Sequence, residues 1–112
     1  MIRVSVDKLE KNGMIGVQEG GNNVLLVKVD SNYFALGDIC PHKKCKLHTG
    51  TLKGNQVICP CHGATFDVTT GILQAWFKSF PPFLIKLIAK IGIMNVKTYK
   101  CAVSGDEILI ET

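Results

Sequence analysis

Hydrophobic and polar side chains alternate in short runs along most of the chain, beginning with Ile2–Val6. Turn-forming residues separate the runs, as in Glu19–Asn23 and Asp30–Asn32. A period of two places successive side chains on opposite faces of a strand. The pattern predicts short strands at 2–6, 14–17, 24–29, 33–36, 51–52, 56–58, 65–67, 97–103 and 107–111.

One segment departs from the alternation. Residues 82–91 form an apolar run that begins after a proline and ends before Gly92, which predicts a short helix. Lys86 and Lys90 are its only charged residues, and their spacing of four places them on one face. Two interpretations stay open. The helix packs into the core with two solvated lysines, or it presents an apolar surface to a partner or a membrane face.

The number and spacing of the strands predict an all-β fold, an antiparallel sandwich. A length of 112 residues suits one domain covering 1–112. The net charge is +4, and Arg3 is the only arginine, so we expect no nucleic-acid partner, because base and phosphate readout relies on arginine. The longest apolar-rich run, Phe80–Met94, is too short and too charged to span a membrane. With no leader pattern at the N-terminus, a cytoplasmic location is expected.

Cysteine and histidine gather in two short segments, 40–45 and 59–62. Their members are Cys40, His42 and Cys45 in the first segment and Cys59, Cys61 and His62 in the second. Soft thiolates favour zinc or iron–sulfur sites, and mixed Cys/His sets serve both. The residue types therefore predict a metal site and leave a structural zinc module open.

The spacing Cys-x-His, sixteen residues, Cys-x-x-His resembles the Rieske family. Further matches are Leu47 and Gly50 after the first pair, Gly63 and Asp67 after the second, Thr70-Gly71, and Val96–Tyr99. The resemblance implies a Rieske fold with a cluster-binding subdomain at about 38–75. It also implies one [2Fe–2S] cluster, with Cys40 and Cys59 on one iron and His42 and His62 on the other.

The two remaining loop cysteines sharpen the resemblance. In the cytochrome bc-complex branch, cysteines at the positions of Cys45 and Cys61 form a disulfide between the loops; two thiols remain the alternative. Among soluble members the chain is most similar to archaeal sulredoxin-type ferredoxins, and thermophilic archaea do keep disulfides inside the cell. Lys44 departs from this pattern, because the bc-type loop usually has glycine there.

The second loop also departs from the bc-type sequence, which has Ser and Tyr hydroxyls where this chain has Ala64 and Phe66. Hydrogen bonds to the sulfur atoms stabilise the reduced cluster, so the resemblance implies a reduction potential below that of the bc-type proteins. It further implies ligand histidine rings exposed at the tip. Electron uptake would then be coupled to proton uptake at alkaline pH.

The function implied is a one-electron carrier with redox protein partners and no chemistry of its own on a substrate. The alternative is the ferredoxin component or small subunit of an oxygenase, nitrite reductase or arsenite oxidase system. A terminal oxygenase is excluded, because its mononuclear iron needs two more histidines and only His48 remains. Lysines near the first loop favour acidic partners: Lys43, Lys44, Lys46 and Lys53. We expect His48 at the surface, Cys101 as a buried thiol, and Pro81-Pro82 in a loop covering the cluster.

Overall fold

The computed structural model describes residues 1–9, 13–40, 45–61, 63–75, 81–91 and 95–112. The strands are β1 (Ile2–Ser5), β2 (Met14–Glu19), β3 (Asn22–Val29), β4 (Asn32–Gly37), β5 (Thr51–Lys53), β6 (Gln56–Ile58), β7 (Thr65–Asp67), β8 (Leu73–Ala75), β9 (Thr98–Tyr99), β10 (Cys101–Ser104) and β11 (Glu107–Ile110). The helical elements are the α-helix α1 (Pro82–Ile91) and the short 3-10 helices η1 (Val6–Leu9) and η2 (Leu47–Thr49).

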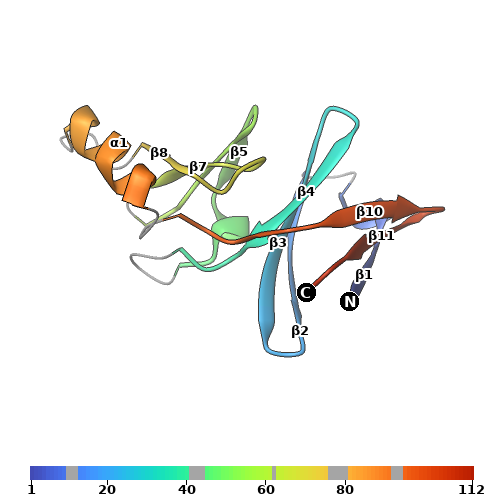
Figure 1. Cartoon of the computed structure of the whole chain (residues 1–112). Helices are drawn as coiled ribbons and strands as arrows, with labels where there is room; N and C mark the ends of the chain where they lie inside the picture. The colour runs from blue at the N-terminus through green and yellow to red at the C-terminus, as the bar shows by residue number, and fades with distance from the viewer. Residues whose placement is uncertain (10–12, 41–44, 62, 76–80, 92–94) are drawn as a thin grey trace.

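The strands form three antiparallel sheets, with the orders β1-β11-β10, β2-β3-β4-β9 and β5-β6-β7-β8. The molecule is elongated, 44 × 25 × 20 Å. Figure 1 shows the sheet of β1, β10 and β11 toward one end with both termini, and the sheet of β5–β8 with α1 toward the other. The predicted all-β antiparallel fold with one short helix at 82–91 is confirmed.

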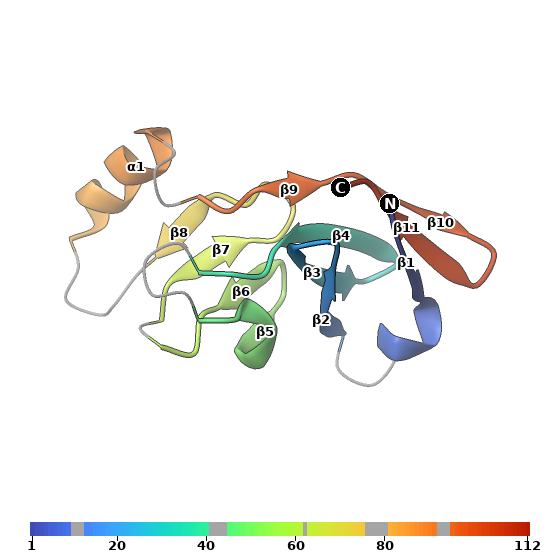
Figure 2. The same ribbon diagram turned by 90° about the horizontal axis from the view of Figure 1, so that it is seen from below.

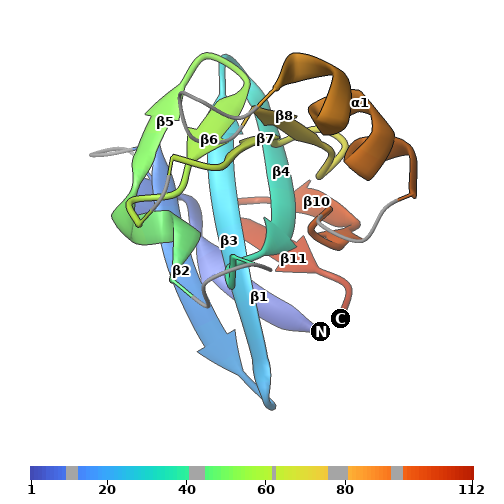
Figure 3. The same ribbon diagram turned by 90° about the vertical axis from the view of Figure 1, so that its left-hand side faces the viewer.

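Strand β3 separates two hydrophobic cores. Its residues Val24–Val27 are all fully buried, which explains the unbroken apolar run in the sequence. Because side chains alternate, Val24 and Leu26 enter the core beside β1 and β11, while Leu25 and Val27 enter the core that contains the cysteines. Figure 2 shows the sheet of β2, β3 and β4 between the strands β5–β8 and the strands β1, β10 and β11, and Figure 3 shows the molecule from the end that carries α1 and β5–β8. The sheet of β2, β3, β4 and β9, which we call the middle sheet, therefore packs against the core that contains Cys40 and Cys59.

The prediction of one continuous strand at 97–103 is wrong. Thr98–Tyr99 pairs with β4 as β9, whereas Cys101–Ser104 pairs with β11 as β10. The chain changes sheets at Lys100, whose carbonyl accepts a hydrogen bond from the Glu111 amide (2.8 Å). The alternation of side chains continues through this change, because a period of two does not depend on which strand is the neighbour.

The structure also contains a strand that the sequence did not predict, β8 at Leu73–Ala75. It pairs with β7 through a register irregularity between Thr65 and Phe66. The Asn95 side chain accepts a hydrogen bond from the Leu73 amide (3.0 Å), which fixes this strand to the segment after the helix.

The two sides of helix α1 agree with the two interpretations given for it, one side with each. Ile85 is buried and Ile88 packs against the same core, as expected for a core-packing helix with solvated lysines. Phe83, Leu87 and Ile91 are exposed. Among the described residues, no helix is long and apolar enough to cross a membrane.

Candidate metal centre

The first cysteine loop, residues 38–48, closes on itself. It leaves the end of β4 and returns through η2 before β5. Three antiparallel contacts join its sides: the Leu47 amide donates to the Asp38 carbonyl (2.7 Å), Ile39 bridges Lys46, and the Cys40 amide donates to the Cys45 carbonyl (2.8 Å). This ladder brings the backbones of Cys40 and Cys45 together at the head of the loop.

A buried carboxylate fastens the base of the same loop. Asp38 accepts two hydrogen bonds from one residue, from the His48 amide (2.8 Å) and from the His48 ring atom Nδ1 (2.6 Å). The Asp38 side chain is almost completely buried, whereas the His48 ring is about one third exposed. A hydrogen bond to a buried charged group is among the stronger ones in a protein. The Asp38–His48 pair is therefore a polar clasp across the base of the loop.

Glycines make room for the loop against its neighbours. A Cβ atom added to Gly16 on β2 would overlap the His48 ring, and one added to Gly50 would overlap the Ile58 carbonyl. Gly16 thus lets the clasp lie directly on the middle sheet. Gly50 lets the chain after the first loop lie directly on the strand that leads into the second.

The second cysteine loop, residues 59–64, is the connection of the hairpin β6–β7. Ile58 and Thr65 pair across its base. Inside it the Cys59 amide donates to the Ala64 carbonyl (2.7 Å), and the Gly63 amide donates to the Cys59 carbonyl (3.2 Å). Gly63 has a positive φ of 74°, a conformation that glycine adopts at little cost. Two backbone hydrogen bonds and the Ile58–Thr65 strand pair therefore shape this turn around Cys59.

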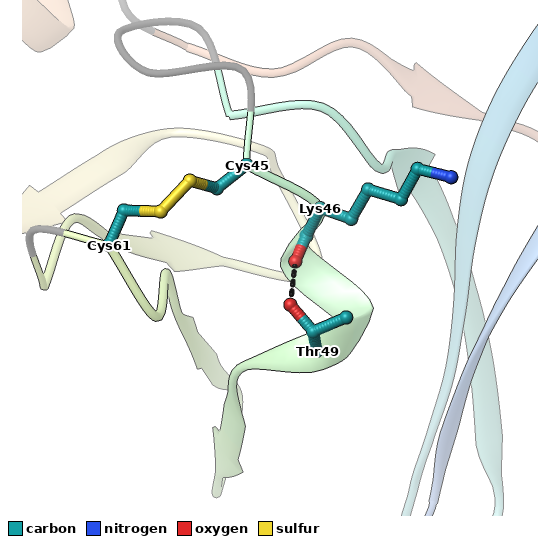
Figure 4. The surroundings of a disulfide bond; sticks show 4 residues. All are labelled: Cys45, Lys46, Thr49 and Cys61. Atoms are coloured by element: carbon teal, nitrogen blue, oxygen red, sulfur yellow. Dashed lines mark hydrogen bonds between the residues drawn. A yellow bond between two sulfur atoms is a disulfide. The ribbon is translucent and has the colours of Figure 1, made fainter.

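A disulfide between Cys45 and Cys61 joins the two loops. This is the pairing that the resemblance implied. The Cα atoms are 6.5 Å apart, within the range that a disulfide spans. Figure 4 shows the bond beside the start of η2, where the Thr49 hydroxyl donates to the Lys46 carbonyl (2.6 Å). The head of the first loop is therefore linked covalently to the tip of the second.

Two buried sulfur atoms remain outside the disulfide. Cys40 is 0% exposed and Cys59 is 2% exposed. The Cys59 sulfur lies within 4.8 Å of both disulfide sulfurs. Because those two sulfurs are bonded to each other, the three cysteines are not a set of three thiolate ligands. One thiol thus comes from each loop, in a water-excluded core. Such a pair fits the thiolate half of a site that binds iron–sulfur or zinc.

The other predicted ligands, His42 and His62, lie outside the described residues, as do Lys43 and Lys44. Lys46 and Lys53 are exposed. Pro81 directly precedes α1. Its carbonyl accepts a hydrogen bond from the Leu84 amide (3.1 Å) at the start of the helix. The predicted covering role of the two prolines stays a prediction.

Two side chains belong to the same hydrophobic core as Cys59. Ala64 and Phe66 are both fully buried in the core that contains Cys40 and Cys59. Neither side chain carries a hydrogen-bond donor. The two positions that carry hydroxyl groups in the bc-type sequence therefore lie in the cysteine core, and here they hold side chains without a donor.

Two expectations need adjustment. His48, expected at the surface, is half-buried because Asp38 and the middle sheet hold its ring. Cys101, expected to be a buried apolar thiol, is partly exposed on β10 and donates to the Tyr33 carbonyl (3.2 Å). Burial nevertheless raises the pKa of the Cys101 thiol. Its place in the core beside β1 and β11 separates it from the core of the two loop thiols.

The sequence reasoning did not find Asp38 or Gly16. An acidic residue two positions before a ligand-type cysteine, with a histidine ten positions later, was a visible signal. That signal is weak, because only the closed loop brings the two side chains together.

Comparison with known proteins agrees with this geometry. The family model for the Rieske [2Fe-2S] domain matches residues 2–100. The naphthalene 1,2-dioxygenase system ferredoxin component of Pseudomonas aeruginosa is 24% identical over 108 residues, 96% of this chain and 90% of that protein. The ferredoxin of carbazole 1,9a-dioxygenase from Nocardioides aromaticivorans has a similar structure, with a TM-score of 0.76 and 25% identity, covering 96% of this chain and 91% of that one.

A shorter match, at higher identity, is to apoptosis-inducing factor 3 of Mus musculus, 44% identical over 69 residues. The match covers 62% of this chain and only 11% of that protein, so it concerns one part of a much larger relative. The family model, in contrast, extends over nearly the whole chain, including both cysteine loops. The chain therefore belongs to the Rieske [2Fe–2S] domain family.

Proposed function

We propose that this protein is a one-electron carrier that holds one [2Fe–2S] cluster on Cys40, His42, Cys59 and His62. The observation that carries the proposal is the pair of buried thiols, one from each of two loops that a disulfide joins, in a chain of the Rieske family. A bound Rieske cluster supplies reversible one-electron chemistry. We take residues 38–75 as the cluster-binding subdomain of a single domain.

The chain's own residues would prepare this site in three ways. Burial of Cys40 and Cys59 keeps water from the sulfur ligands. The disulfide and the Asp38–His48 clasp hold the loops in place. Ala64 and Phe66 offer no hydroxyl to the sulfur atoms, which favours a moderate potential. Coupling of the potential to pH in the alkaline range stays a prediction.

The partners are proposed to be redox proteins. Ferredoxin components of dioxygenase systems are similar to nearly the whole chain, which supports an oxygenase component as one electron acceptor. Exposed Lys46 and Lys53 favour partners with acidic surfaces. The Cys45–Cys61 disulfide supports the finer likeness to sulredoxin-type ferredoxins. A cytoplasmic location remains the expectation.

The test is spectroscopy of the purified protein before and after anaerobic reduction with dithionite. We expect visible absorption in the oxidised form and, in the reduced form, an electron paramagnetic resonance signal with the low average g value of Cys₂His₂ ligation. Metal analysis should give about two iron atoms and two sulfides per chain, the content of one [2Fe–2S] cluster. A colourless protein containing zinc would contradict the proposal and support the zinc module.

Variants locate the ligands. Cys40→Ser and Cys59→Ser should each lose the visible spectrum. Cys101→Ser is the matched control, because Cys101 lies in the other core and should leave the spectrum unchanged. Retention of an unchanged spectrum by either loop variant would remove that cysteine from the ligand set.

A further inference from the structure

Helix α1 lies at one end of the elongated molecule. It follows β8, packs beside that strand, and is far from the termini and the β10–β11 hairpin in both views (Figures 1 and 2). Its inner side is anchored, because Ile85 is buried and Ile88 packs against the cysteine core. The helix is therefore a fixed part of the surface on the side that carries the sheet of β5–β8.

The outer side of α1 carries a continuous apolar ridge. Phe83 is 71% exposed, Leu87 53% and Ile91 60%. Residues four apart lie above one another on a helix, so these three side chains form one line, which we call the outer stripe. With a rise of about 1.5 Å per residue, the outer stripe is roughly 12 Å long. Large apolar side chains gathered in this way mark an interaction surface.

The charged residues of α1 all have one sign. Lys86 and Lys90 are exposed and each directly precedes a stripe residue, so both lie along the same edge of the ridge. Helix α1 contains no acidic residue. The surface thus combines an apolar ridge with a border of positive charge, which attracts a partner that is apolar inside and anionic at its boundary.

We propose that the outer stripe docks on an anionic lipid membrane, with α1 lying in the plane of the headgroups. Phenylalanine, leucine and isoleucine would enter the boundary between headgroups and acyl chains, as interfacial amphipathic helices do. Lysine stems can lie along the apolar ridge while their ammonium groups reach anionic lipid headgroups. The association would be peripheral, since no described helix spans a membrane.

Shape favours lipid over a second copy or another protein. A stable protein interface needs about 20–30 residues on each side. The outer stripe is a convex ridge of one ten-residue helix and offers far fewer. A bilayer surface accepts a convex ridge without a complementary groove. Docking in this way would hold the end with β5–β8 at the membrane and leave the β10–β11 hairpin pointing away (Figure 1).

The experiment is flotation of the intact protein with vesicles of phosphatidylcholine alone or with added phosphatidylglycerol. We expect binding to the anionic vesicles, weakened at least tenfold in 0.5 M salt and on neutral vesicles. The triple variant Phe83→Ser/Leu87→Ser/Ile91→Ser should lose binding at least tenfold in low salt. The double variant Lys86→Gln/Lys90→Gln should retain only the weak vesicle binding that does not depend on salt. Val103→Ser is the matched control, because Val103 is 54% exposed on β10 at the far end and should not affect binding.

A retained visible spectrum and circular dichroism spectrum show that the variants are folded. No flotation of the parent protein with anionic vesicles would overturn the proposal, and so would equal binding by the triple variant. Sedimentation without lipid completes the test. A dimer of the parent that the triple variant abolishes, in the absence of vesicle binding, would assign the outer stripe to a second copy. The visible spectrum is measured separately, so membrane binding and cluster binding can fail independently.

Discussion

The two cysteine loops reach the same site but are built differently. The second loop is the tip of the hairpin β6–β7, so the register of the strands closes it and backbone hydrogen bonds suffice. The first loop connects β4 to β5, which belong to different sheets. In its described part, the single bridge Ile39–Lys46 and two backbone hydrogen bonds cross this loop, and the Asp38–His48 clasp fastens its base. A loop between two sheets needs side chains to do what strand register does in a hairpin.

The strongest way to break this comparison is Asp38→Ala. The change leaves the partly buried His48 amide and ring nitrogen without their acceptor, at about 1–3 kcal/mol for each orphaned group. We expect the thermal midpoint of the cluster-loaded protein to fall by about 10 °C, since 1 kcal/mol shifts it by about 4 °C at this size. The measurement is loss of visible absorbance and of circular dichroism on heating.

Asp67→Ala is the matched control for that experiment. Asp67 also accepts two hydrogen bonds from one residue, from the Thr69 amide (2.8 Å) and hydroxyl (2.6 Å), but in an exposed turn. Water can replace the lost acceptor there, so the midpoint should fall by less than about 4 °C. Equal effects of the two substitutions would show that the clasp is no more than an ordinary surface turn.

The double variant Cys45→Ser/Cys61→Ser tests whether the loops depend on each other. The disulfide closes a segment of 16 residues. A loop of that length gives about 3 kcal/mol of stability in the chain-entropy estimate, an effect similar in size to the one expected for Asp38→Ala. The double variant should release its cluster faster on heating than the parent, and dithiothreitol should affect only the parent. If the reductant destabilised both proteins alike, the disulfide would not be its target.

Phe66→Tyr sharpens the comparison at the second loop, where a hydroxyl would enter the cysteine core. One hydrogen bond to a charged acceptor gives about 1.5 kcal/mol, which for one electron corresponds to roughly 60 mV. We expect the midpoint potential to rise by an amount on that order, measured by redox titration of the visible spectrum. Phe34→Tyr is the control, because Phe34 packs on the same core from β4 and should leave the potential within about 10 mV. An unchanged or lower potential in Phe66→Tyr would contradict the assigned role of residue 66.

The smallest effect is expected from Thr65→Val. The Thr65 hydroxyl donates to the Gly63 carbonyl (3.1 Å) beside the second loop. Its loss should cost about 1 kcal/mol, or about 4 °C in the thermal midpoint, because the backbone still closes the turn. Thr51→Val, at an exposed strand position, is the comparison. A loss as large as that of Asp38→Ala would mean that the second loop also depends on a side chain.

The sequence was sufficient to predict those elements that depend on a local pattern of residues. The strand at 24–29, the turns at 19–23 and 30–32 and the helix at 82–91 follow from the apolar pattern and turn chemistry, and all are present in the structure. The break at Lys100 could not be predicted, because it depends on which sheet each half of the segment joins. Cysteine spacing suggested the site, but the clasp required Asp38 and His48 to meet across a closed loop.

The pairing of β1 with β11 sets an order of assembly during synthesis. Ile2 faces Ile110 in this sheet, so β1 has no partner on its β11 side until almost the whole domain has been made. The strands β5–β8 come from the continuous stretch 51–75, and both cysteine loops precede residue 65. At about 5–20 residues per second, the nascent chain can form the cysteine loops seconds before it can complete the sheet that contains its first strand. During that interval β1 is an open edge of the kind that attracts aggregation, and completion of β11 removes it.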